Sequence, residues 1–301
     1  MNKQDPSWEL YRSFLGILRA GSLSGAARLL GLTQPTVGRH LDALEQGIGM
    51  VLFVRSQHGL SPTREAEALR PYAEAMESTS AALLRVMSSR QGVVRGTVRI
   101  TASEVVSVEV LPPILARLRE AHAELIIELV ATDRMEDLLQ RDADIAVRMA
   151  RPSQSALVAR RVGEVELGCY AHRRYLERRG VPQTLDELAG HDMIGFDRET
   201  AFTRAVLNDL PFLAQAQFAL RCDNDLANLA ALRAGFGIGI CQVGLARGNA
   251  DLVRLFPQQV SYMLDTWIAM HEDLRQNAVC KATFAALVDG MTQYIESAQA
   301  P

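Results

Sequence analysis

The sequence lacks the features that mark membrane, exported and disulfide-stapled proteins. None of its apolar runs approaches the roughly 20 residues that a helix needs to cross a bilayer. The N-terminal segment MNKQDPSWELYRS has no apolar signal core, so we expect a cytoplasmic protein without a membrane partner. The four cysteines lie far apart and form no CxxC pair, which indicates reduced thiols rather than a disulfide framework.

Signatures of catalysis and of bound metals are missing as well. The six histidines show no metal-ligand spacing, and no Gly-x-Ser-x-Gly nucleophile elbow occurs. The segment Gly235-Phe-Gly-Ile-Gly follows an expected helix instead of opening one, which favours glycines that end a helix over a dinucleotide-binding loop. We therefore expect no enzyme, no metal and no cofactor.

The composition is that of a folded chain with more than one domain. Hydrophobic residues make up 48% and charged residues 22% of the sequence, which excludes disordered and collagen-like proteins. A length of 301 residues exceeds the usual size of a single domain. The formal net charge of -3 is too small to identify a partner.

The first 50 residues have the pattern of three helices. Apolar side chains form one stripe over residues 7–20, and Gly21 is expected to end that helix. Ser22 or Ser24 can cap a second helix that stops at Gly31, and Thr33 can cap a third. The side chains expected to be buried in the second and third helices are Ala26, Ala27, Leu29, Leu30, Val37, Leu41 and Leu44.

The outward face of the third helix is polar, with Gln34, Thr36, Arg39 and His40. Two short helices joined by a tight turn form a helix-turn-helix, which offers its second helix to the major groove. Arginine can read guanine or a phosphate, and glutamine can read adenine. By spacing alone, a plain three-helix bundle with a polar face explains this pattern equally well.

A short hairpin after the third helix favours DNA binding. The β-branched and aromatic run from Met50 reaches a polar turn at Gln57-His58-Gly59 and then returns. A hairpin in this place is a wing. It would bring Arg55 and His58 to the phosphate backbone or the minor groove.

Residues 8–66 resemble the winged helix-turn-helix of LysR-type transcriptional regulators. The stretches that carry the resemblance are Gly21-Ser-Leu-Ser-Gly-Ala-Ala-Arg-Leu-Leu, Thr33-Gln-Pro-Thr-Val-Gly-Arg-His-Leu-Asp-Ala-Leu-Glu and Leu52-Phe-Val-Arg. The chain departs from the family at Gly38, where serine is common, and at Glu65 and Ala66 after the wing. The resemblance implies binding to double-stranded promoter DNA. The candidate contacts are Ser22, Thr33, Gln34, Pro35, Thr36, Arg39, His40, Arg55 and His58.

A long helix is expected from Thr63 to about Arg90, with Pro71 as its one breaker. Its apolar positions are heptad-like, with Leu69, Met76 and Leu83 seven residues apart and Tyr72, Thr79 and Val86 as the alternate seam. One interpretation is a surface helix packed on its own domain. The resemblance implies a linker helix that pairs with its counterpart in a homodimer, within a homotetramer.

The rest of the sequence alternates strands with helices, which predicts a parallel sheet covered on both faces. Strands are expected at 97–102, 125–130, 143–148, 156–171, 193–197, 218–221 and 267–270, and helices at 112–121, 135–140, 184–189, 224–234 and 276–295. This order resembles the LysR effector-binding domain, which has two lobes of the periplasmic-binding-protein type (type 2), with the chain crossing between them twice.

The predicted fold class is therefore α/β with an N-terminal winged helix-turn-helix, a linker helix and a two-lobed effector domain. We expect the DNA-binding domain at 1–66, the linker helix and hinge at 67–92, and the effector-binding domain at 93–301. Lobe I would hold 93–163 and 267–301, and lobe II would hold 164–266. The resemblance implies a transcriptional regulator that responds to a small molecule, with an RNA polymerase contact if it activates. A substrate-binding or enzymatic α/β protein with an incidental helical N-terminus is the alternative.

Ligands of open α/β sheets bind beyond the carboxyl ends of the strands. The candidate effector contacts at such ends are Thr101, Ser103, Thr132, Arg148, Phe196 and Asp223. The resemblance points most directly to Ser103, Thr132 and Arg148. Each has an ordinary structural interpretation as well: a helix cap, a turn residue and a partner of Asp144, respectively. Glu104 near the same ends argues against a strongly anionic ligand.

Overall fold

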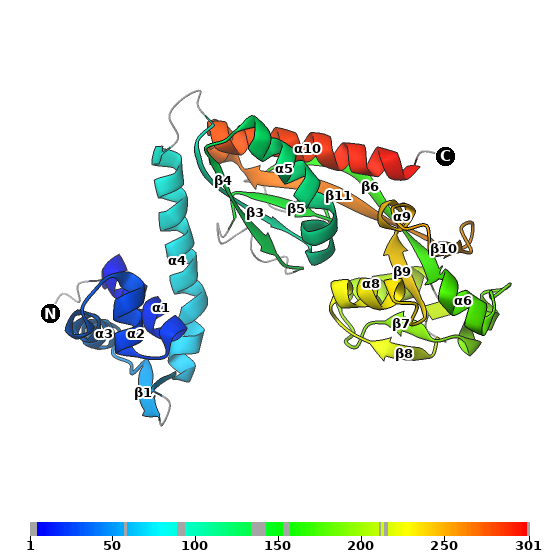
Figure 1. Cartoon of the computed structure of the whole chain (residues 1–301). Coiled ribbons are helices and arrows are strands. Elements are labelled where there is room, and N and C mark those ends of the chain that lie inside the picture. The colour runs from blue at the N-terminus through cyan, green and yellow to red at the C-terminus, as the bar shows by residue number, and fades with distance from the viewer. Residues whose placement is uncertain are drawn as a thin grey trace. The chain divides into compact units, whose positions relative to one another are not determined.

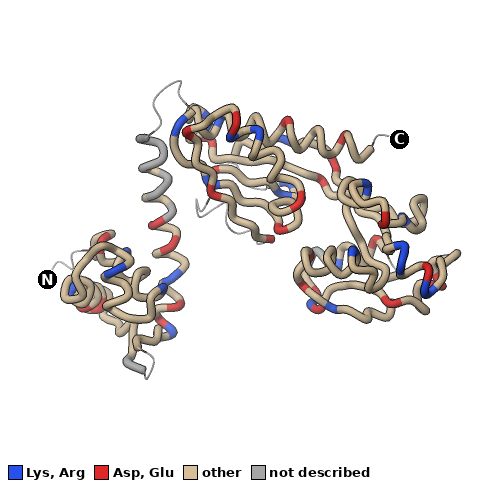
Figure 2. The backbone as a smooth tube through the Cα atoms, in the orientation of Figure 1, with Lys and Arg blue, Asp and Glu red and all other residues tan. Residues whose placement is uncertain are grey.

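The computed structural model describes residues 5–56, 59–88, 94–133, 143–152, 157–210, 212–213 and 216–299. The chain forms two compact units, the first reaching to Met87 and the second holding most of the remainder from Ser88. Basic and acidic residues are interspersed along the backbone of both units (Figure 2). Among the described residues, no helix is both long and apolar enough to span a bilayer.

Three short helices pack together in the first unit (Figure 1): α1 (Trp8–Ala20), α2 (Leu23–Leu30) and α3 (Gln34–Ile48). Each of them ends at a glycine in the left-handed conformation, namely Gly21, Gly31 and Gly49. The side chain of Ser22 caps α2, and that of Thr33 caps α3. These local signals confirm the predicted start and end of α2 and the start of α3.

The core of the first unit is built from Phe14, Ile17, Val37 and Leu44, which are fully buried. The small, buried Ala26 and Ala27 let α2 approach its neighbours closely. The prediction that Leu29 is buried was wrong, because its side chain is 58% exposed. A helix of eight residues buries one narrow stripe, and Leu29 lies beside that stripe.

The predicted hairpin is present as β1 (Phe53–Ser56) paired antiparallel with β2 (Gly59–Pro62). The amide of Leu60 donates to the carbonyl of Gly21 over 2.8 Å, which joins the hairpin to the turn between α1 and α2. Gly59 has a φ of 120°, and a Cβ there would lie 2.5 Å from the Gly21 carbonyl oxygen. Only glycine fits at this position.

Helix α4 (Arg64–Ser88) follows the hairpin and includes Pro71. Ala66 and Ala73 on its inner side are buried in the core of the first unit. Glu77 accepts hydrogen bonds from both terminal nitrogens of Arg19 on α1, which fixes the helix to the three-helix group. Tyr72 and Leu83, by contrast, are 72% and 59% exposed.

One continuous path of hydrogen-bonded strands runs through the second unit, in the order β4-β3-β5-β11-β6-β9-β7-β8, with β10 also paired to β6. The strands are β3 (Gly96–Ala102), β4 (Leu125–Ala131), β5 (Ile145–Arg148), β6 (Leu157–His172), β7 (Met193–Gly195), β8 (Phe218–Arg221), β9 (Ile238–Gln242), β10 (Leu252–Leu255) and β11 (Ser261–His271). The parallel groups around β3 and β7 are joined by the long antiparallel pair of β6 and β11 (Figure 1).

The pairing of β6 with β11 shifts its register between Thr266 and Trp267. Gly163 lies opposite Thr266 with a φ of 133°, and a Cβ there would lie 3.1 Å from Ile295. Such a bulge bends a strand and increases its twist. The irregularity therefore lies where the two long strands pass from one group of strands to the other.

The helices of the second unit are η1 (Val106–Val110), α5 (Leu111–Ala121), α6 (Arg173–Arg179), η3 (Asp186–Gly190), α7 (Ala201–Asp209), α8 (Asp225–Arg233), α9 (Val243–Arg247), η5 (Glu272–Leu274) and α10 (Ala278–Gln299). Sequence patterns gave α5, α8 and α10 but missed α6, α7, α9, β9 and β10. The helix expected at 184–189 is a short 3-10 turn, and the strand expected at 267–270 begins six residues earlier. The helix expected at 135–140 lies outside the described residues.

Candidate functional site

Helix α3 separates its polar face from its apolar face. Val37, Leu41 and Leu44 are buried, whereas Gln34 and Arg39 are exposed. Pro35 is exposed in the first turn, where its missing N–H costs no helical hydrogen bond. The outward polar set therefore lies near the N-terminus of α3, the part of a recognition helix that reaches base edges.

The hydroxyls at the start of α3 also hold the helix itself. The Oγ1 of Thr33 accepts from the amide of Thr36 over 3.4 Å, and the two threonine hydroxyls are 2.8 Å apart. Ser22 caps α2 in the same way by accepting from the amide of Gly25 over 3.1 Å. Ser22, Thr33 and Thr36 therefore each make a hydrogen bond that holds a helix, and each remains at least partly exposed.

His40 departs from the outward placement that we predicted. Its ring is half-buried, and its Nδ1 lies 2.7 Å from the Oγ of Ser13, a side chain that is itself buried. The reason is geometric: His40 lies one residue before buried Leu41, so part of its ring turns toward α1. Arg55 lies on β1, and His58 lies outside the described residues.

Glu45 has a role that the sequence analysis missed. Its Oε1 accepts from the amides of Leu52 and Phe53, over 2.6 and 3.3 Å. The rings of Phe14 and Phe53 also meet, with centroids 5.7 Å apart. These contacts fix the start of the hairpin against α3 and α1. A glutamate seven residues before a strand carries no local signal of such a contact.

In the second unit, the ends of β3 and β5 hold a buried pair of candidate residues. Arg148 is 7% exposed and Thr101 is 1% exposed. The Nη2 of Arg148 donates to the hydroxyl of Thr101 over 2.8 Å. Buried Asp144 accepts from the amide of Arg99 over 2.8 Å. Arg148 thus braces its own group of strands through Thr101.

The loops after β3 and β4 meet at the same edge. The amide of Thr132 donates to the carbonyl of Ala102 over 2.9 Å. At the start of the next helix, the amide of Glu104 donates to the Oδ1 of Asp133 over 3.2 Å. Ser103 and Thr132 are both half-buried at this edge.

The ends of β7 and β8 are tied together by Asp223. Its Oδ1 accepts from the amides of Asp197 and Arg198, over 3.0 and 2.9 Å. Phe196 is half-buried beside them. Asp223 therefore already accepts hydrogen bonds from two consecutive backbone amides in the loop after β7.

Helix α8 joins these two edges. The side-chain amide of Asn224, the N-cap of α8, donates to Glu104 over 2.5 Å. At the other end of α8, Arg233 donates to both carboxylate oxygens of Glu109, over 2.8 and 2.7 Å. Burial, together with nearby Asp133 and Glu104, raises the pKa of Asp225 to about 6. Glu104 was expected from the sequence to lie near the effector site, but its contact with Asn224 and the Glu109–Arg233 pair were not predicted.

Two family models match this chain. Residues 8–67 match the bacterial regulatory helix-turn-helix protein of the lysR family, and residues 91–292 match the LysR substrate binding domain. The second match alone covers more than half of the chain. The chain belongs to the LysR family.

Curated relatives in this family are transcriptional regulators. The chain is 28% identical over 184 residues to the HTH-type transcriptional regulator CrgA of Neisseria meningitidis, a match that spans 61% of each protein. It is 32% identical over 159 residues to the mau operon transcriptional activator of Paracoccus denitrificans, across 53% of this chain and 56% of that protein. The chain thus spans about three fifths of the length of each of these two relatives.

The fold agrees with that of a full-length LysR regulator. The structure of CbnR in a complex with its target DNA superimposes with a TM-score of 0.63 and 18% identity, over 94% of this chain and 99% of that one. The resemblance to LysR regulators that we identified from the sequence is confirmed, as is the two-part fold class.

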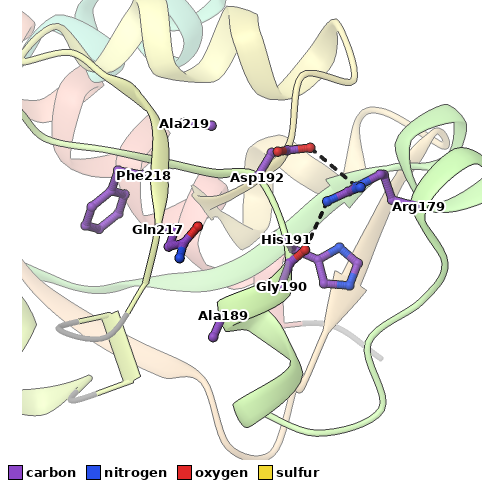
Figure 3. A pocket seen from close by; sticks show the side chains of 8 residues that line it. All are labelled: Arg179, Ala189, Gly190, His191, Asp192, Gln217, Phe218 and Ala219. Atoms are coloured by element: carbon purple, nitrogen blue, oxygen red, sulfur yellow. Dashed lines mark hydrogen bonds and ion pairs between the residues drawn. The ribbon is translucent and has the colours of Figure 1, made fainter.

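Within the part of this LysR chain that the structure describes, two pockets lie away from the strand ends described above. One pocket, of about 200 Å³, lies between Asp192 and Phe218, at the beginnings of β7 and β8 (Figure 3). Arg179 donates to the carbonyl of Gly190 and pairs with Asp192 at its rim. The other pocket is a groove of about 430 Å³ between α5 and α10. Neither pocket is lined by a candidate effector residue.

Two of the four cysteines of this LysR protein, Cys169 and Cys241, are buried and poorly placed for redox chemistry. Burial raises the pKa of both Cys169 and Cys241 to about 12, so each stays a neutral thiol at ordinary pH. A thiol reacts as its thiolate, and burial in apolar surroundings suppresses that form. Within the described residues, no group of three or more His, Cys, Asp or Glu side chains could hold a metal ion.

Proposed function

We propose that this chain is a ligand-responsive, DNA-binding transcriptional regulator and not an enzyme. It reads double-stranded promoter DNA with α3 and the β1–β2 wing. It senses a small molecule at the strand ends of the second unit, and it works in the cytoplasm without a further cofactor. The observation that carries the proposal is the polar face of α3: Gln34 and Arg39 are exposed while Val37 and Leu41 on the other face are buried.

The DNA contacts divide into two kinds. Gln34 and Arg39 are placed for base edges, where each good pair contributes roughly 1–3 kcal/mol of discrimination. Ser22, Thr33, Thr36 and His40 are placed to support the helices and to touch phosphates, and Arg55 and His58 belong to the wing. Helix N-termini such as those of α2 and α3 favour phosphate oxygens.

The effector site is proposed at the carboxyl ends of the strands, where α8 brings the two groups of strands together. Its candidate residues are Thr101, Ser103, Thr132, Arg148, Phe196 and Asp223. Glu104, Asp133 and Asp225 lie at the same ends, and burial together with the two other carboxylates raises the pKa of Asp225 to about 6. This concentration of carboxylates favours a neutral or hydrogen-bond-donating effector over a strongly anionic one.

The proposed organisation is the one expected from the sequence. Residues 1–66 form the reader, 67–92 the linker, and 93–301 the sensor, with lobe I at 93–163 and 267–301 and lobe II at 164–266. The register shift opposite Gly163 supports this lobe boundary. The exposed apolar residues of α4 support a homodimer within a homotetramer, and an activating protein of this kind would also contact RNA polymerase.

Selection of genomic duplex fragments with the wild-type chain tests the proposal. Fragments that it enriches are labelled and titrated by fluorescence anisotropy. Arg39→Ala should weaken binding to the enriched duplex by roughly 10- to 100-fold and relax its sequence preference. Arg12→Ala removes another exposed arginine, on α1, where it pairs with Glu9, and serves as the control for net charge. Failure to enrich any duplex, or unchanged binding by Arg39→Ala, contradicts the proposal.

A further inference from the structure

Two side-chain contacts join helix α8 of lobe II to lobe I, outside the long strands β6 and β11. Both use the helix that starts at Glu104 in lobe I and helix α8 in lobe II. Glu104 accepts from the Nδ2 of Asn224 over 2.5 Å, at the beginning of α8. Glu109 accepts from both terminal nitrogens of Arg233 over 2.8 and 2.7 Å, at its end.

The first turns of the lobe I helix are wound as a π-helix over Val106–Val110. A π-turn closes its hydrogen bonds over five residues, so residues five apart lie close to the same side. Glu104 and Glu109 are five residues apart and both contact α8. Glu109 lies within the π-turn and Glu104 just before it, and both carboxylates contact α8 of the other lobe. π-turns are frequent at functional positions.

The Glu109–Arg233 pair is the stronger of the two contacts. Two charge-assisted hydrogen bonds join the guanidinium to the carboxylate. Such bonds are shorter than neutral ones, and the bidentate arrangement is more directional than a single hydrogen bond. The hydrogen bonds from Arg233 lower the pKa of Glu109. The side chain of Glu109 is 22% exposed, and that of Arg233 is 35% exposed. It is therefore screened by solvent less than a surface pair.

The lobes are also tied on the side of α10. The hydroxyl of Tyr294 donates to the Oε1 of Gln242 over 2.7 Å, close to the register shift opposite Gly163. A bulge in the two crossing strands provides the place where the lobes can bend. When the lobes bend at this bulge, the part of the interface between them that holds the contacts of α8 opens.

We infer that Glu104–Asn224 and Glu109–Arg233 form a clasp that holds the two lobes together and sets the free energy needed to open them. The clasp itself does not depend on the proposed sensor function. Only its effect on the response to a ligand rests on that proposal. A ligand shifts the lobes only by its different affinity for their open and closed states, so the strength of the clasp sets how large that difference must be. Arg233 and Glu109 are positioning residues that contact no ligand in this scheme.

The distance between the lobes tests the clasp directly. Spin labels are placed at Arg119→Cys on α5 and Val181→Cys in lobe II, two exposed positions, with Cys222→Ser to remove the half-buried thiol. Labelled full-length chain is diluted with an excess of unlabelled chain, so that only distances within one chain are recorded. The experiment needs neither DNA nor effector, and failure of the clasp is therefore distinguished from failure of the proposed function.

Glu109→Gln and Arg233→Ala should each lower the ratio of closed to open molecules by about fivefold, the upper end for partly exposed pairs. The exchanged double variant Glu109→Arg/Arg233→Glu should restore the wild-type distance distribution. Arg174→Ala, an exposed arginine on α6 of the same lobe, should leave it unchanged. Wild-type distributions in both single variants overturn the inference, and so does an exchanged variant that is folded but remains open.

Asn224 offers a second, independent variant. Its Oδ1 also caps α8 by accepting from the amide of Ala227 over 2.8 Å, so replacement by alanine would disturb the helix. Aspartate and serine both keep the cap. Asn224→Asp places a carboxylate against Glu104 and should open the lobes more than Asn224→Ser, which only removes the donor. Equal distributions for these two variants would show that Glu104 does not take part in the clasp.

Discussion

The two units of this LysR chain hold their candidate contact residues in opposite ways. In the first unit Gln34 and Arg39 are exposed on a helix whose other face is buried. In the second unit Thr101 and Arg148 are buried and bonded to each other. An exposed, preformed surface can bind a rigid duplex without rearrangement, whereas residues that already have partners must exchange them when a ligand arrives.

This difference predicts how substitutions should behave in the two units. In the reader, a change at a contact residue should alter binding and leave stability almost untouched. In the sensor, a change at a contact residue should alter stability first, because the same group braces the fold. Each prediction that follows tests one side of this comparison.

The largest effect is expected at the exposed apolar residues of α4. Leu83 is 59% exposed in the single chain, and Leu83→Asp would place a charge in the proposed helix pair. We expect a loss of association worth about 2–5 kcal/mol per chain, the range for deleting a buried leucine. Light scattering should show smaller assemblies, with unchanged secondary structure by circular dichroism.

The comparison variant for assembly is Thr79→Asp, an exposed position in the alternate seam of the same helix, whose hydroxyl donates to the carbonyl of Ala75. It introduces the same charge without removing a large apolar side chain, so its effect should be smaller. An assembly that survives Leu83→Asp intact would show that α4 packs only on its own unit, as the alternative interpretation of the heptad pattern holds.

The second prediction concerns Arg148. Replacing it with alanine leaves the buried hydroxyl of Thr101 without its donor, which should lower the stability of the second unit by about 1–3 kcal/mol. Thermal unfolding without ligand measures this loss. Binding of the effector-free chain to its enriched duplex should stay close to wild type, because Arg148 belongs to the sensor.

Arg198→Ala is the control, since Arg198 is a largely exposed arginine that pairs with Asp223. An unchanged melting temperature for Arg148→Ala would mean that this arginine does not stabilise the fold and serves only to bind a ligand. A small-molecule thermal-shift screen on both variants then separates the two roles, because an anchor loses the ligand shift whatever its effect on the unliganded fold.

The third prediction is a dependence on pH through Asp225. Its pKa is raised from 3.8 to about 6 by burial and by the facing carboxylates Asp133 and Glu104. A carboxyl whose pKa is raised on folding binds its proton more tightly when folded, so its contribution to stability is complete below pH 3.8 and is lost as pH rises through 6. We expect the second unit to be more stable at about pH 5 than at pH 7.5, by roughly 1–2 kcal/mol.

Urea unfolding across this range measures the effect. Asp225→Asn should flatten the dependence and raise stability near neutral pH, because the amide carries no charge. Glu109 acts in the opposite direction only in stronger acid, since Arg233 lowers its pKa below 4.5. A slope that persists unchanged in Asp225→Asn would assign the dependence to other groups.

The same comparison explains which parts of the structure could be predicted from the sequence. Capping residues and left-handed glycines act over a few residues, so Ser22, Gly31 and Thr33 were identified at their observed places. The long strands β6 and β11 pair residues about 100 positions apart, and no local pattern gives the length of such strands. Short helices such as α6 carry too few turns to show a clear period.

The candidate sites follow the same rule. The polar face of α3 was found because burial alternates along one helix. The contacts of Arg233 with Glu109 and of Glu45 with the hairpin join residues from different elements, and only the folded chain brings them together. His40 was misplaced because its Ser13 partner lies on another helix.

The smallest predicted effect belongs to Thr33, which caps α3 and is also a candidate DNA contact. Thr33→Ala removes the acceptor for the Thr36 amide and should lower the stability of the first unit by about 1 kcal/mol. Thr33→Ser keeps the acceptor, so it should restore most of that stability. If Thr33 only supports the helix, duplex affinity per folded molecule should be the same for both variants. If its hydroxyl also binds a phosphate, alanine should weaken affinity at low salt while serine does not, and the loss should shrink as salt rises. Thermal unfolding and anisotropy on the same two samples measure both quantities, and an affinity loss shared equally by alanine and serine would mean that the threonine methyl group makes the contact.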